Sequence, residues 1–133
     1  MGVKVVATIG REKYYTEVVA GSHKIFTDEP KRFGGEEKGF NPYEILASSL
    51  ASCTAATLRM YVDKKGWDVE TIRVDVQFEN FPMQERSEFT RAICFPDANL
   101  DAEALDKLFD IAEACPVHKL LTNKIDINTE IVK

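Results

Sequence analysis

The sequence predicts an α+β protein in which antiparallel sheets surround one long central helix. Three patterns lead to this fold class: short alternating segments near the start, an unbroken helical pattern over residues 42–65, and a strand hairpin over residues 69–95. With 133 residues, the chain has the length of about one domain and can bury a core. We therefore expect a single domain over residues 1–133.

The N-terminal segment reads as a small antiparallel meander. Apolar residues alternate with polar or smaller ones, and Gly10 and Gly21 mark the two turns. The expected strands span residues 3–7, 14–19 and 23–27. Residues 28–40 contain Pro30 and three glycines, which predicts a loop that serves as a hinge or crossover.

A long helix is expected from Pro42 to about Lys65. Asn41 is a good N-cap, proline suits the first helical position because its nitrogen has no proton to leave unpaired, and Gly66 ends the pattern. Such a helix would be about 35 Å long. Its apolar and small anchors recur at spacings of three and four, which places Cys53 on their face. The anchors are Ile45, Leu46, Ser49, Leu50, Cys53, Ala56, Thr57, Met60 and Tyr61.

The second half of the chain predicts a hairpin, two helical segments and a final strand. In chain order, we expect strands at 69–79 and 88–95, a helix from Asn99 or Asp101 to about Ala114, helical turns from Pro116 to Leu121, and a strand at 125–131. The last strand is inferred from the alternation of Ile125, Ile127 and Ile131. The order βββ-α-ββ-α-β with antiparallel pairing is typical of an α+β fold.

Composition and charge argue against several partners. The net charge is −5 and the isoelectric point is about 5.1, whereas a broad nucleic-acid-binding surface needs clustered lysines and arginines. The N-terminus lacks the pattern of a secretory signal, and no uninterrupted apolar stretch approaches the length of a membrane span. We expect a cytoplasmic protein with neither a nucleic-acid partner nor a membrane partner.

Two of the three cysteines stand in places that packing alone does not explain. Cys53 lies midway along the small-residue helix, and Cys115 opens a Cys-Pro-Val-His-Lys segment. In a reducing compartment, free thiols or a catalytic pair are favoured over structural disulfides. Pairing of Cys53 with Cys115 across the fold would form a redox centre. Cys94 falls in an expected strand and is interpreted as packed there.

Cys115 and His118 also form a short Cys-x-x-His unit, a spacing that can bind a metal. Zinc normally takes four ligands in a structural site, and His23 and Cys94 are the remaining soft candidates. We expect no metal and no organic cofactor, and we interpret His118 as a surface or capping side chain. A metal site at Cys115 and His118 stays a minor alternative.

Several segments together resemble the OsmC/Ohr family, the osmotically inducible and organic hydroperoxide resistance proteins. The resemblance covers nearly the whole chain, and its strongest part is two cysteines in order, each in its expected context. The matching segments are His23, Asp28-Glu29-Pro30, Gly34-Gly35, Asn41 to Ala47, Cys53-Thr54, Leu58 to Tyr61, Lys65-Gly66-Trp67 and Cys115 to Lys119. The resemblance implies the OsmC-like fold as an intertwined homodimer, with two long central helices between sheets and active sites at the subunit interface.

The resemblance also implies a cysteine-based thiol peroxidase that reduces peroxides, preferentially organic hydroperoxides. Cys53 would be the peroxidatic nucleophile, whose thiolate attacks the terminal peroxide oxygen and becomes a sulfenic acid. Cys115, at the start of a helical turn, would resolve that sulfenic acid by forming a disulfide. An external dithiol, of a lipoyl or thioredoxin type, would then reduce the disulfide.

A mid-helix thiol gains nothing from a helix N-terminus, so formation of the Cys53 thiolate calls for a nearby cation. Hydroperoxide-reducing relatives place an arginine near the first hairpin turn, which corresponds to Arg11. Glu44 would hold that arginine through a carboxylate pair and could accept the thiol proton. Arg32 and Arg59 are rivals of Arg11. The alternative interpretations are a solvated turn arginine and a carboxylate that stabilises the first helical turn.

The family pattern also bears on the substrate. The organic hydroperoxide branch has an acidic residue directly after the helix-opening proline, where this chain has Tyr43. The alternative function is an OsmC-like stress protein or small-molecule-binding protein whose cysteines are redox-sensitive but turn over slowly. In the preceding loop, Asp28 and Glu29 read as solvated charges, although the resemblance implies that they position the crossover.

Overall fold

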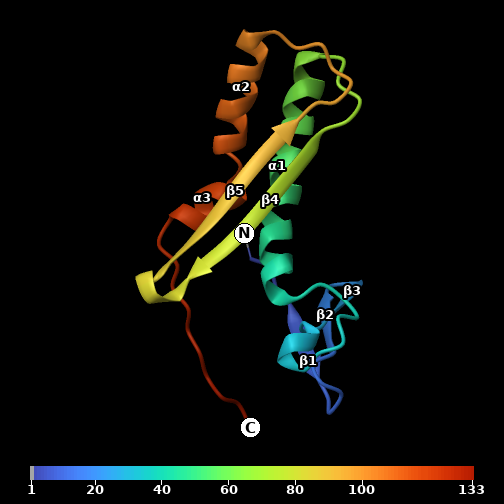
Figure 1. Cartoon of the computed structure of the whole chain (residues 1–133), viewed down its shortest axis with the longest axis vertical. Coiled ribbons are helices and arrows are strands. Elements are labelled where there is room, and N and C mark those ends of the chain that lie inside the picture. The colour runs from blue at the N-terminus through green and yellow to red at the C-terminus, as the bar shows by residue number, and fades with distance from the viewer. Residues whose placement is uncertain (1) are drawn as a thin grey trace. The chain divides into compact units, whose positions relative to one another are not determined.

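The computed structural model describes residues 2–133 (Figure 1). The chain forms two compact units, Met1–Leu46 and Ala47–Lys133, with the boundary inside the helix α1 (Pro42–Lys65). Antiparallel sheets and this one long helix dominate the secondary structure. The α+β class predicted from the sequence is therefore confirmed.

The N-terminal unit contains a three-stranded antiparallel sheet in the order β1-β2-β3. The strands are β1 (Val6–Ile9), β2 (Thr16–Ala20) and β3 (His23–Thr27). Val18 on the central strand pairs with Ala7 on one side and with Ile25 on the other. The predicted meander is confirmed, with its first two strands displaced slightly toward the C-terminus.

One buried carboxylate organises the loop that follows β3. Asp28 is only 2 % exposed. Its Oδ1 accepts hydrogen bonds from the backbone N–H groups of Tyr14 and Glu29, at 3.1 and 2.8 Å. Its Oδ2 accepts from those of Glu36 and Lys38, at 3.4 and 3.2 Å. The interpretation of Asp28 as a solvated charge is wrong, because water is replaced by four backbone donors.

The same contacts predict an acid-sensitive contribution to stability. Burial raises the pKa of Asp28, but the four backbone N–H groups outweigh it, and the net pKa lies below the ordinary value. Since the unfolded chain has a pKa of about 3.9, the carboxylate stabilises the fold above that pH and loses its contribution as the pH falls through the folded-state pKa. We expect Asp28→Asn to lower the thermal unfolding temperature at neutral pH, because an amide turns N–H donors toward the backbone N–H groups that Oδ2 now binds.

This difference between wild type and Asp28→Asn should begin to narrow below about pH 4 and should close once the pH falls below the folded-state pKa of Asp28. Thermal unfolding followed by circular dichroism across the acid range measures it. A difference that stays constant from neutral to acid pH would show that the charge of Asp28 has no part in the effect.

Two glycines make the tight course of this loop possible. The short 3-10 turn η1 (Lys31–Phe33) ends at Gly34, whose φ of 94° lies in the left-handed region that favours glycine. A Cβ atom at Gly35 would collide with the carbonyl group of Glu29. The sequence prediction of a glycine-rich loop is therefore confirmed, and its compactness has a steric reason.

The C-terminal unit combines a two-stranded antiparallel hairpin with α2, α3 and most of α1 (Figure 1). The new elements are β4 (Arg73–Phe81), β5 (Arg86–Cys94), α2 (Ala102–Glu113) and α3 (Pro116–Thr122). Figure 1 shows the hairpin running along α1. The helix α2 begins as predicted, because the Asp101 side chain caps it by accepting a hydrogen bond from the N–H of Ala104 at 2.8 Å.

The core of this unit lies between α1 and α2. It consists of Leu58 and Val62 from α1, Val69 from the segment after α1, and Leu108 and Ala112 from α2. Leu58 and Val62 have no exposed surface, and burying one such side chain stabilises the fold by about 1.5–3 kcal/mol. Partly buried residues surround the cluster, namely Tyr61, Trp67, Ile72, Ile93, Phe95, Ala98, Leu100 and Ile111. The core therefore fixes α2 and the hairpin against α1.

The buried face of α1 differs from the predicted one. Residues four apart form the buried line, which consists of Leu50, Thr54, Leu58 and Val62. Met60, which was assigned to the apolar face, is 71 % exposed. A helix rich in alanine and serine has little apolar contrast around its circumference, so periodicity locates its buried face poorly.

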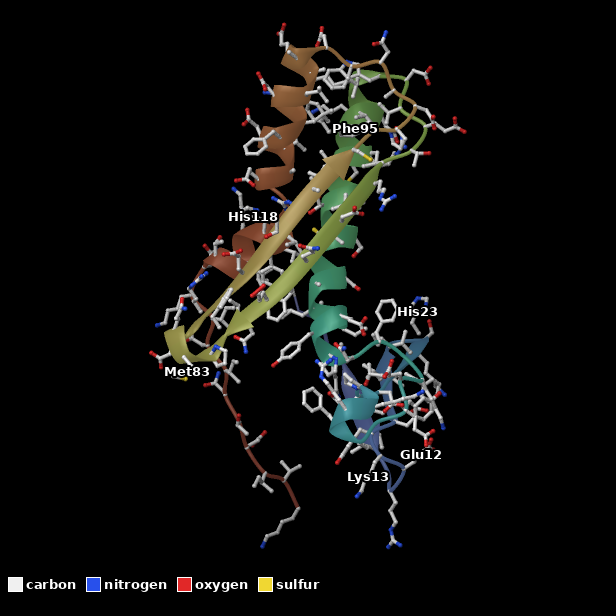
Figure 2. All side chains as sticks on the ribbon, viewed as in Figure 1. Glu12, Lys13, His23, Met83, Phe95 and His118 are labelled. Atoms are coloured by element: carbon white, nitrogen blue, oxygen red, sulfur yellow. The ribbon has the colours of Figure 1, made fainter. Side chains whose placement is uncertain are left out.

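The turn between β4 and β5 ends the hairpin. The predicted strands at 69–79 and 88–95 leave residues 80–87 for this turn, which is formed by η2 (Pro82–Gln84) and by Glu85, which adopts a left-handed conformation with φ of 50°. Met83 in this turn is 98 % exposed. Figure 2 shows it at the tip of the hairpin. The predicted position of the hairpin is thus confirmed to within a few residues.

Two predictions about the strands need correction. β4 begins at Arg73 rather than at residue 69, because Val69 is part of the core cluster and precedes the sheet. Cys94 does lie on a strand, but its side chain is exposed in this chain. The interpretation of Cys94 as a packed residue is therefore wrong for the single chain.

The closing strand predicted at residues 125–131 does not form among residues 2–133. Ile125, Ile127 and Ile131 are 56 %, 85 % and 96 % exposed. Alternating apolar residues suit a half-buried strand, but a strand also needs a neighbouring edge to pair with. Within the described chain, this segment pairs with no edge.

The helix α1 is long and apolar enough to cross a membrane, judged by length and composition alone. The core helix of a soluble protein meets the same criterion, and α1 supplies two members of the core cluster. The helix therefore gives only weak support for a membrane span.

Candidate functional site

The structure brings the two predicted site cysteines together. Cys53 lies midway along α1 and is half-buried, whereas Cys115 directly precedes α3 and has no exposed surface. The side chains of Cys53 and Cys115 are hydrogen-bonded to each other, and both thiols are free. Residues 62 positions apart in the sequence thus form one pair of thiols in the C-terminal unit.

The environment of Cys115 favours its thiolate. Burial raises the pKa of this thiol, because a charged sulfur loses its water. Hydrogen bonds from the backbone N–H of His118, the Thr54 hydroxyl, the Cys53 thiol and the backbone N–H of Val117 act in the opposite direction. Their combined effect is larger, so the pKa of Cys115 lies below its ordinary value.

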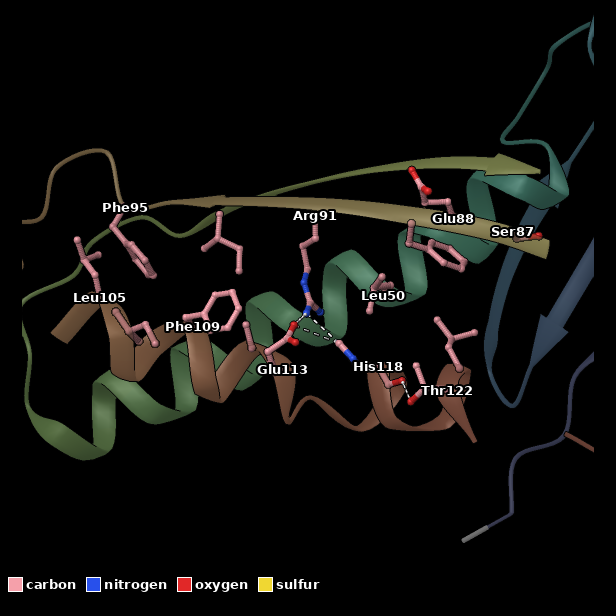
Figure 3. A pocket seen from close by; sticks show the side chains of 15 residues that line it. Leu50, Ser87, Glu88, Arg91, Phe95, Leu105, Phe109, Glu113, His118 and Thr122 are labelled. Carbon is pink, nitrogen blue, oxygen red and sulfur yellow. Dashed lines mark hydrogen bonds and ion pairs between the residues drawn. The ribbon is translucent and has the colours of Figure 1, made fainter. Parts of the chain in front are cut away.

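A buried arginine lies next to this pair, and sequence reasoning did not single it out. Arg91 on β5 has a side chain that is only 10 % exposed. Its Nη1 donates to Thr54 Oγ1 at 3.0 Å. Its Nη2 lies 2.9 Å from both Glu113 Oε2 and His118 Nδ1, and Figure 3 shows these two contacts. Thr54 Oγ1 in turn lies 3.7 Å from the sulfur of Cys115. Arg91 is therefore linked to Cys115 of the thiol pair through the Thr54 hydroxyl.

The side chain of His118 contacts the guanidinium of Arg91. A guanidinium group only donates hydrogen bonds, so His118 Nδ1 must be the acceptor in this pair. The interpretation of His118 as a surface or capping side chain is wrong, because its ring is 28 % exposed and is held by Arg91.

A cavity of about 840 Å³ opens beside this cluster (Figure 3). Its polar lining includes Arg91, Glu113 and His118. Its apolar lining comes from β5, α1, α2, α3 and the segment after β5, and consists of Leu50, Phe89, Ile93, Phe95, Leu105, Leu108, Phe109, Ala112 and Leu121. A largely apolar cavity with a few convergent polar groups is typical of a small-molecule site.

Arg59, one of the predicted thiolate partners, has another role. Its Nη1 donates to the carboxylate of Asp63 at 3.2 Å and to the carbonyl of Val69 at 2.7 Å. Its Nη2 donates to the carbonyl of Glu70 at 2.8 Å. The guanidinium therefore holds the segment after α1.

Arg11 and Arg32 both belong to the N-terminal unit. Arg11 is exposed in the turn between β1 and β2, as the hairpin pattern predicts. The guanidinium of Arg32 lies over the ring of Phe33, at 4.8 Å from its centroid. A role for Arg11 or Arg32 as the thiolate partner stays a prediction.

Glu44 closes a capping box at the start of α1. Its Oε1 accepts from the N–H of Asn41, and its own N–H donates to Asn41 Oδ1, both at 2.9 Å. These two bonds satisfy backbone donors that a helix start leaves unpaired. The structural interpretation of Glu44 thus has direct support, and its pairing with an arginine stays a prediction.

One signal in the sequence could have identified Arg91. Along β5, Phe89, Arg91 and Ile93 alternate with more exposed residues and so share one face of the strand. Burying a charged side chain on the apolar face of a strand costs free energy unless the charge is paired. Such a position therefore points to a partner group, which here is the cluster of Thr54 and Glu113 with His118.

The alternative metal site finds no support in side-chain geometry. Among residues 2–133, no group of three or more His, Cys, Asp or Glu side chains is arranged to hold a metal ion. His23 lies on β3 in the N-terminal unit, and His118 lies on α3 in the C-terminal unit (Figure 2).

Comparison with known proteins places the chain among relatives of similar fold. Residues 35–130 match the family described as OsmC-like protein. No curated protein matches the chain in sequence. The family match covers most of the chain, including α1, the hairpin and both thiols.

Solved structures of similar fold come from several bacteria. One from Psychrobacter arcticus 273-4, described as an osmotic-stress-induced and detoxification response protein, is 25 % identical with a TM-score of 0.75, covering 90 % of this chain and 87 % of that one. An OsmC-like protein from Mycoplasma pneumoniae is 20 % identical with a TM-score of 0.72, covering 100 % and 99 %. The organic hydroperoxide resistance protein OhrB of Bacillus subtilis is 22 % identical with a TM-score of 0.63, covering 95 % and 94 %. The resemblance noted in the sequence is confirmed, and the chain belongs to the OsmC-like protein family.

Proposed function

We propose that the protein is a cysteine-based thiol peroxidase that reduces organic hydroperoxides with electrons from an external dithiol. The observation that carries this proposal is the contact between Cys53 and Cys115. Two free thiols within hydrogen-bonding reach of each other can alternate between a dithiol and a disulfide without a large rearrangement.

The different access of the two thiols supports the roles proposed for them. Cys53 is half-buried and can meet a peroxide, whereas Cys115 has no exposed surface. Once it has lost its proton, Cys53 attacks the terminal oxygen of the hydroperoxide, so that an S–O bond forms and the O–O bond breaks. The leaving alkoxide takes up a proton and departs as an alcohol. The sulfur, oxidised by two electrons, becomes a sulfenic acid.

The second step uses the favoured thiolate of Cys115. This thiolate attacks the sulfenic sulfur of Cys53, an S–S bond forms, and the departing hydroxide is protonated to water. An external dithiol then opens the disulfide through a mixed disulfide and is itself oxidised. A lipoyl-type or thioredoxin-type donor would supply this dithiol, and no metal or organic cofactor takes part.

The cavity indicates the substrate class. Its apolar lining suits an alkyl or aryl group, and Arg91 both lines the cavity and contacts Thr54, the neighbour of Cys53 in the chain. Relatives of similar fold include a protein named for organic hydroperoxide resistance in Bacillus subtilis. An organic hydroperoxide would therefore place its tail in the cavity and its peroxide group near Cys53.

The working form would be a cytoplasmic homodimer. Apolar side chains are exposed in the single chain along α1 and the C-terminal segment, including Met60, Ile127, Ile131 and Val132. Large apolar side chains left in water on a single chain are what a partner could cover. A second copy would cover it and supply the edge that residues 125–131 lack for strand pairing.

The cavity also favours a second candidate function, the binding of an apolar small molecule. Its volume of about 840 Å³ falls in the range of ligand sites. In that case Cys53 and Cys115 would be redox-sensitive without rapid turnover. Kinetics separate the two functions, because a binding protein does not consume peroxide continuously.

The test is peroxide consumption with cumene hydroperoxide and dihydrolipoamide. We expect sustained turnover that needs both the protein and the dithiol. Cys94→Ser, which removes an exposed thiol outside the pair, should turn over like the wild type. Consumption no faster than that of the dithiol alone would contradict the peroxidase and leave ligand binding as the better explanation.

A further inference from the structure

The Thr54 hydroxyl lies between the arginine cluster and the thiol pair. Thr54 has no exposed surface. Its Oγ1 receives the Arg91 hydrogen bond at 3.0 Å, lies 2.7 Å from the carbonyl oxygen of Leu50, and lies 3.7 Å from the Cys115 sulfur. Two of these neighbours, the Leu50 carbonyl and the Cys115 sulfur, can accept the single proton of the hydroxyl.

The partners compete for one proton. A hydroxyl carries one O–H donor and two acceptor lone pairs, and Arg91 occupies a lone pair. The proton can therefore turn either to the Leu50 carbonyl or to the Cys115 sulfur. A neutral thiol is a weak acceptor, whereas a thiolate is charged and accepts strongly. The Leu50 carbonyl loses little when the proton turns away, because in an α-helix it also accepts from the backbone N–H four residues on.

Arg91 is itself held in place. Its Nη2 has two partners, Glu113 at 2.9 Å and His118 at 2.9 Å, so its Nη1 stays directed at Thr54. These two are the titratable side chains that face the guanidinium, and the carboxylate of Glu113 balances its charge. Donation from a cation also polarises the hydroxyl and makes its proton a stronger donor.

We propose that Arg91 is a positioning residue that orients and polarises the Thr54 hydroxyl, and that this hydroxyl stabilises the Cys115 thiolate. No peroxide atom touches Arg91 in this role. The effect on catalysis rests on the proposed function, since a larger thiolate fraction of Cys115 would speed the attack on the Cys53 sulfenic acid. The effect of Arg91 and Thr54 on the acidity of Cys115 does not depend on the proposed function.

The test is a thiol titration by ultraviolet absorbance in the Cys94→Ser background, where the pair contributes the remaining thiols. Two thiols in contact titrate together, so the quantity measured is the lower apparent pKa of the pair. We expect Thr54→Val to raise it by about one unit and Thr54→Ser, which keeps the hydroxyl, to restore it. Arg91→Met should raise it by a similar amount.

The decisive variant combines the two changes. If Arg91 acts through the hydroxyl, Arg91→Met should cause no further shift once Thr54→Val is present. Equal shifts with and without the hydroxyl would mean that Arg91 acts directly through its charge, and no shift in any variant would remove both residues from the acidity of the pair. Either result overturns the proposal. Should Arg91→Met not fold, Arg91→Gln, which also removes the charge, answers the same question in both backgrounds.

Arg86→Met is the matched control. Arg86 lies on the same strand, is exposed, and binds Gln84 and Glu88. Its replacement should leave the titration unchanged. Because the titration uses no peroxide, a protein that shows the predicted shifts but no peroxide turnover would refute the proposed function alone.

Discussion

Replacing Cys53 with serine is expected to abolish peroxide turnover, lowering kcat/KM for cumene hydroperoxide by about 10³-fold or more. A serine hydroxyl is not ionised at neutral pH and cannot stand in for a thiolate as the attacking group. The change removes one sulfur atom from a half-buried position and leaves the core cluster of Leu58 and Val62 untouched. We therefore expect the variant to fold like the wild type and to fail in the first chemical step.

The measurement is steady-state peroxide consumption with dihydrolipoamide as reductant. Cys94→Ser makes the same chemical change at an exposed thiol and controls for a general effect of losing a cysteine. Equal rates for Cys53→Ser and wild type, with both proteins folded, would exclude Cys53 as the nucleophile.

Replacing Cys115 with serine is expected to separate the two chemical steps. Cys53 keeps its access to peroxide, so one equivalent of hydroperoxide should still be reduced in the first turnover. The sulfenic acid then has no internal thiol to condense with and accumulates. Turnover with the dithiol should fall by about 10- to 100-fold, because the external reductant must now attack the sulfenic acid from solution.

Trapping with a sulfenic-acid-specific nucleophile, followed by mass spectrometry, measures this intermediate. The adduct should map to Cys53 in Cys115→Ser and be scarce in the wild type. If Cys115→Ser consumes peroxide at the wild-type rate, or if the adduct is equally scarce in both proteins, Cys115 does not resolve the intermediate.

The sequence carries strong local signals for most of the fold. The start of α1 follows from Asn41 and Pro42, and its end follows from Gly66. The start of α2 follows from the cap at Asp101. These residues act through their own backbone neighbourhood, so their effect can be predicted without knowing the tertiary contacts.

Features that depend on distant partners were harder to predict. The alternation of Ile125 and Ile127 signals a strand, but an alternating pattern does not say whether an edge is present to pair with it. The buried face of α1 was misplaced because Ala and Ser give a helix little apolar contrast, and a β-hairpin and α2 decide which face is covered.

In the candidate site, too, some features follow from local sequence and others depend on distant partners. The two cysteines could be paired from their sequence contexts, and the structure places Cys53 and Cys115 in contact. The cation was sought at Arg11, Arg32 or Arg59, whereas the structure links Arg91 to the pair through Thr54. Arg91 comes from a strand far from either cysteine in sequence, and the contact exists only because β5 packs over α1 and α2.

The most direct test of the proposed redox pair is disulfide mapping after one equivalent of cumene hydroperoxide. Free thiols are alkylated, the protein is digested, and linked peptides are identified by mass spectrometry. We predict one intramolecular disulfide between Cys53 and Cys115, formed as fast as the peroxide disappears. Thiols that remain free, or a disulfide that runs instead through Cys94 or between chains, would contradict it.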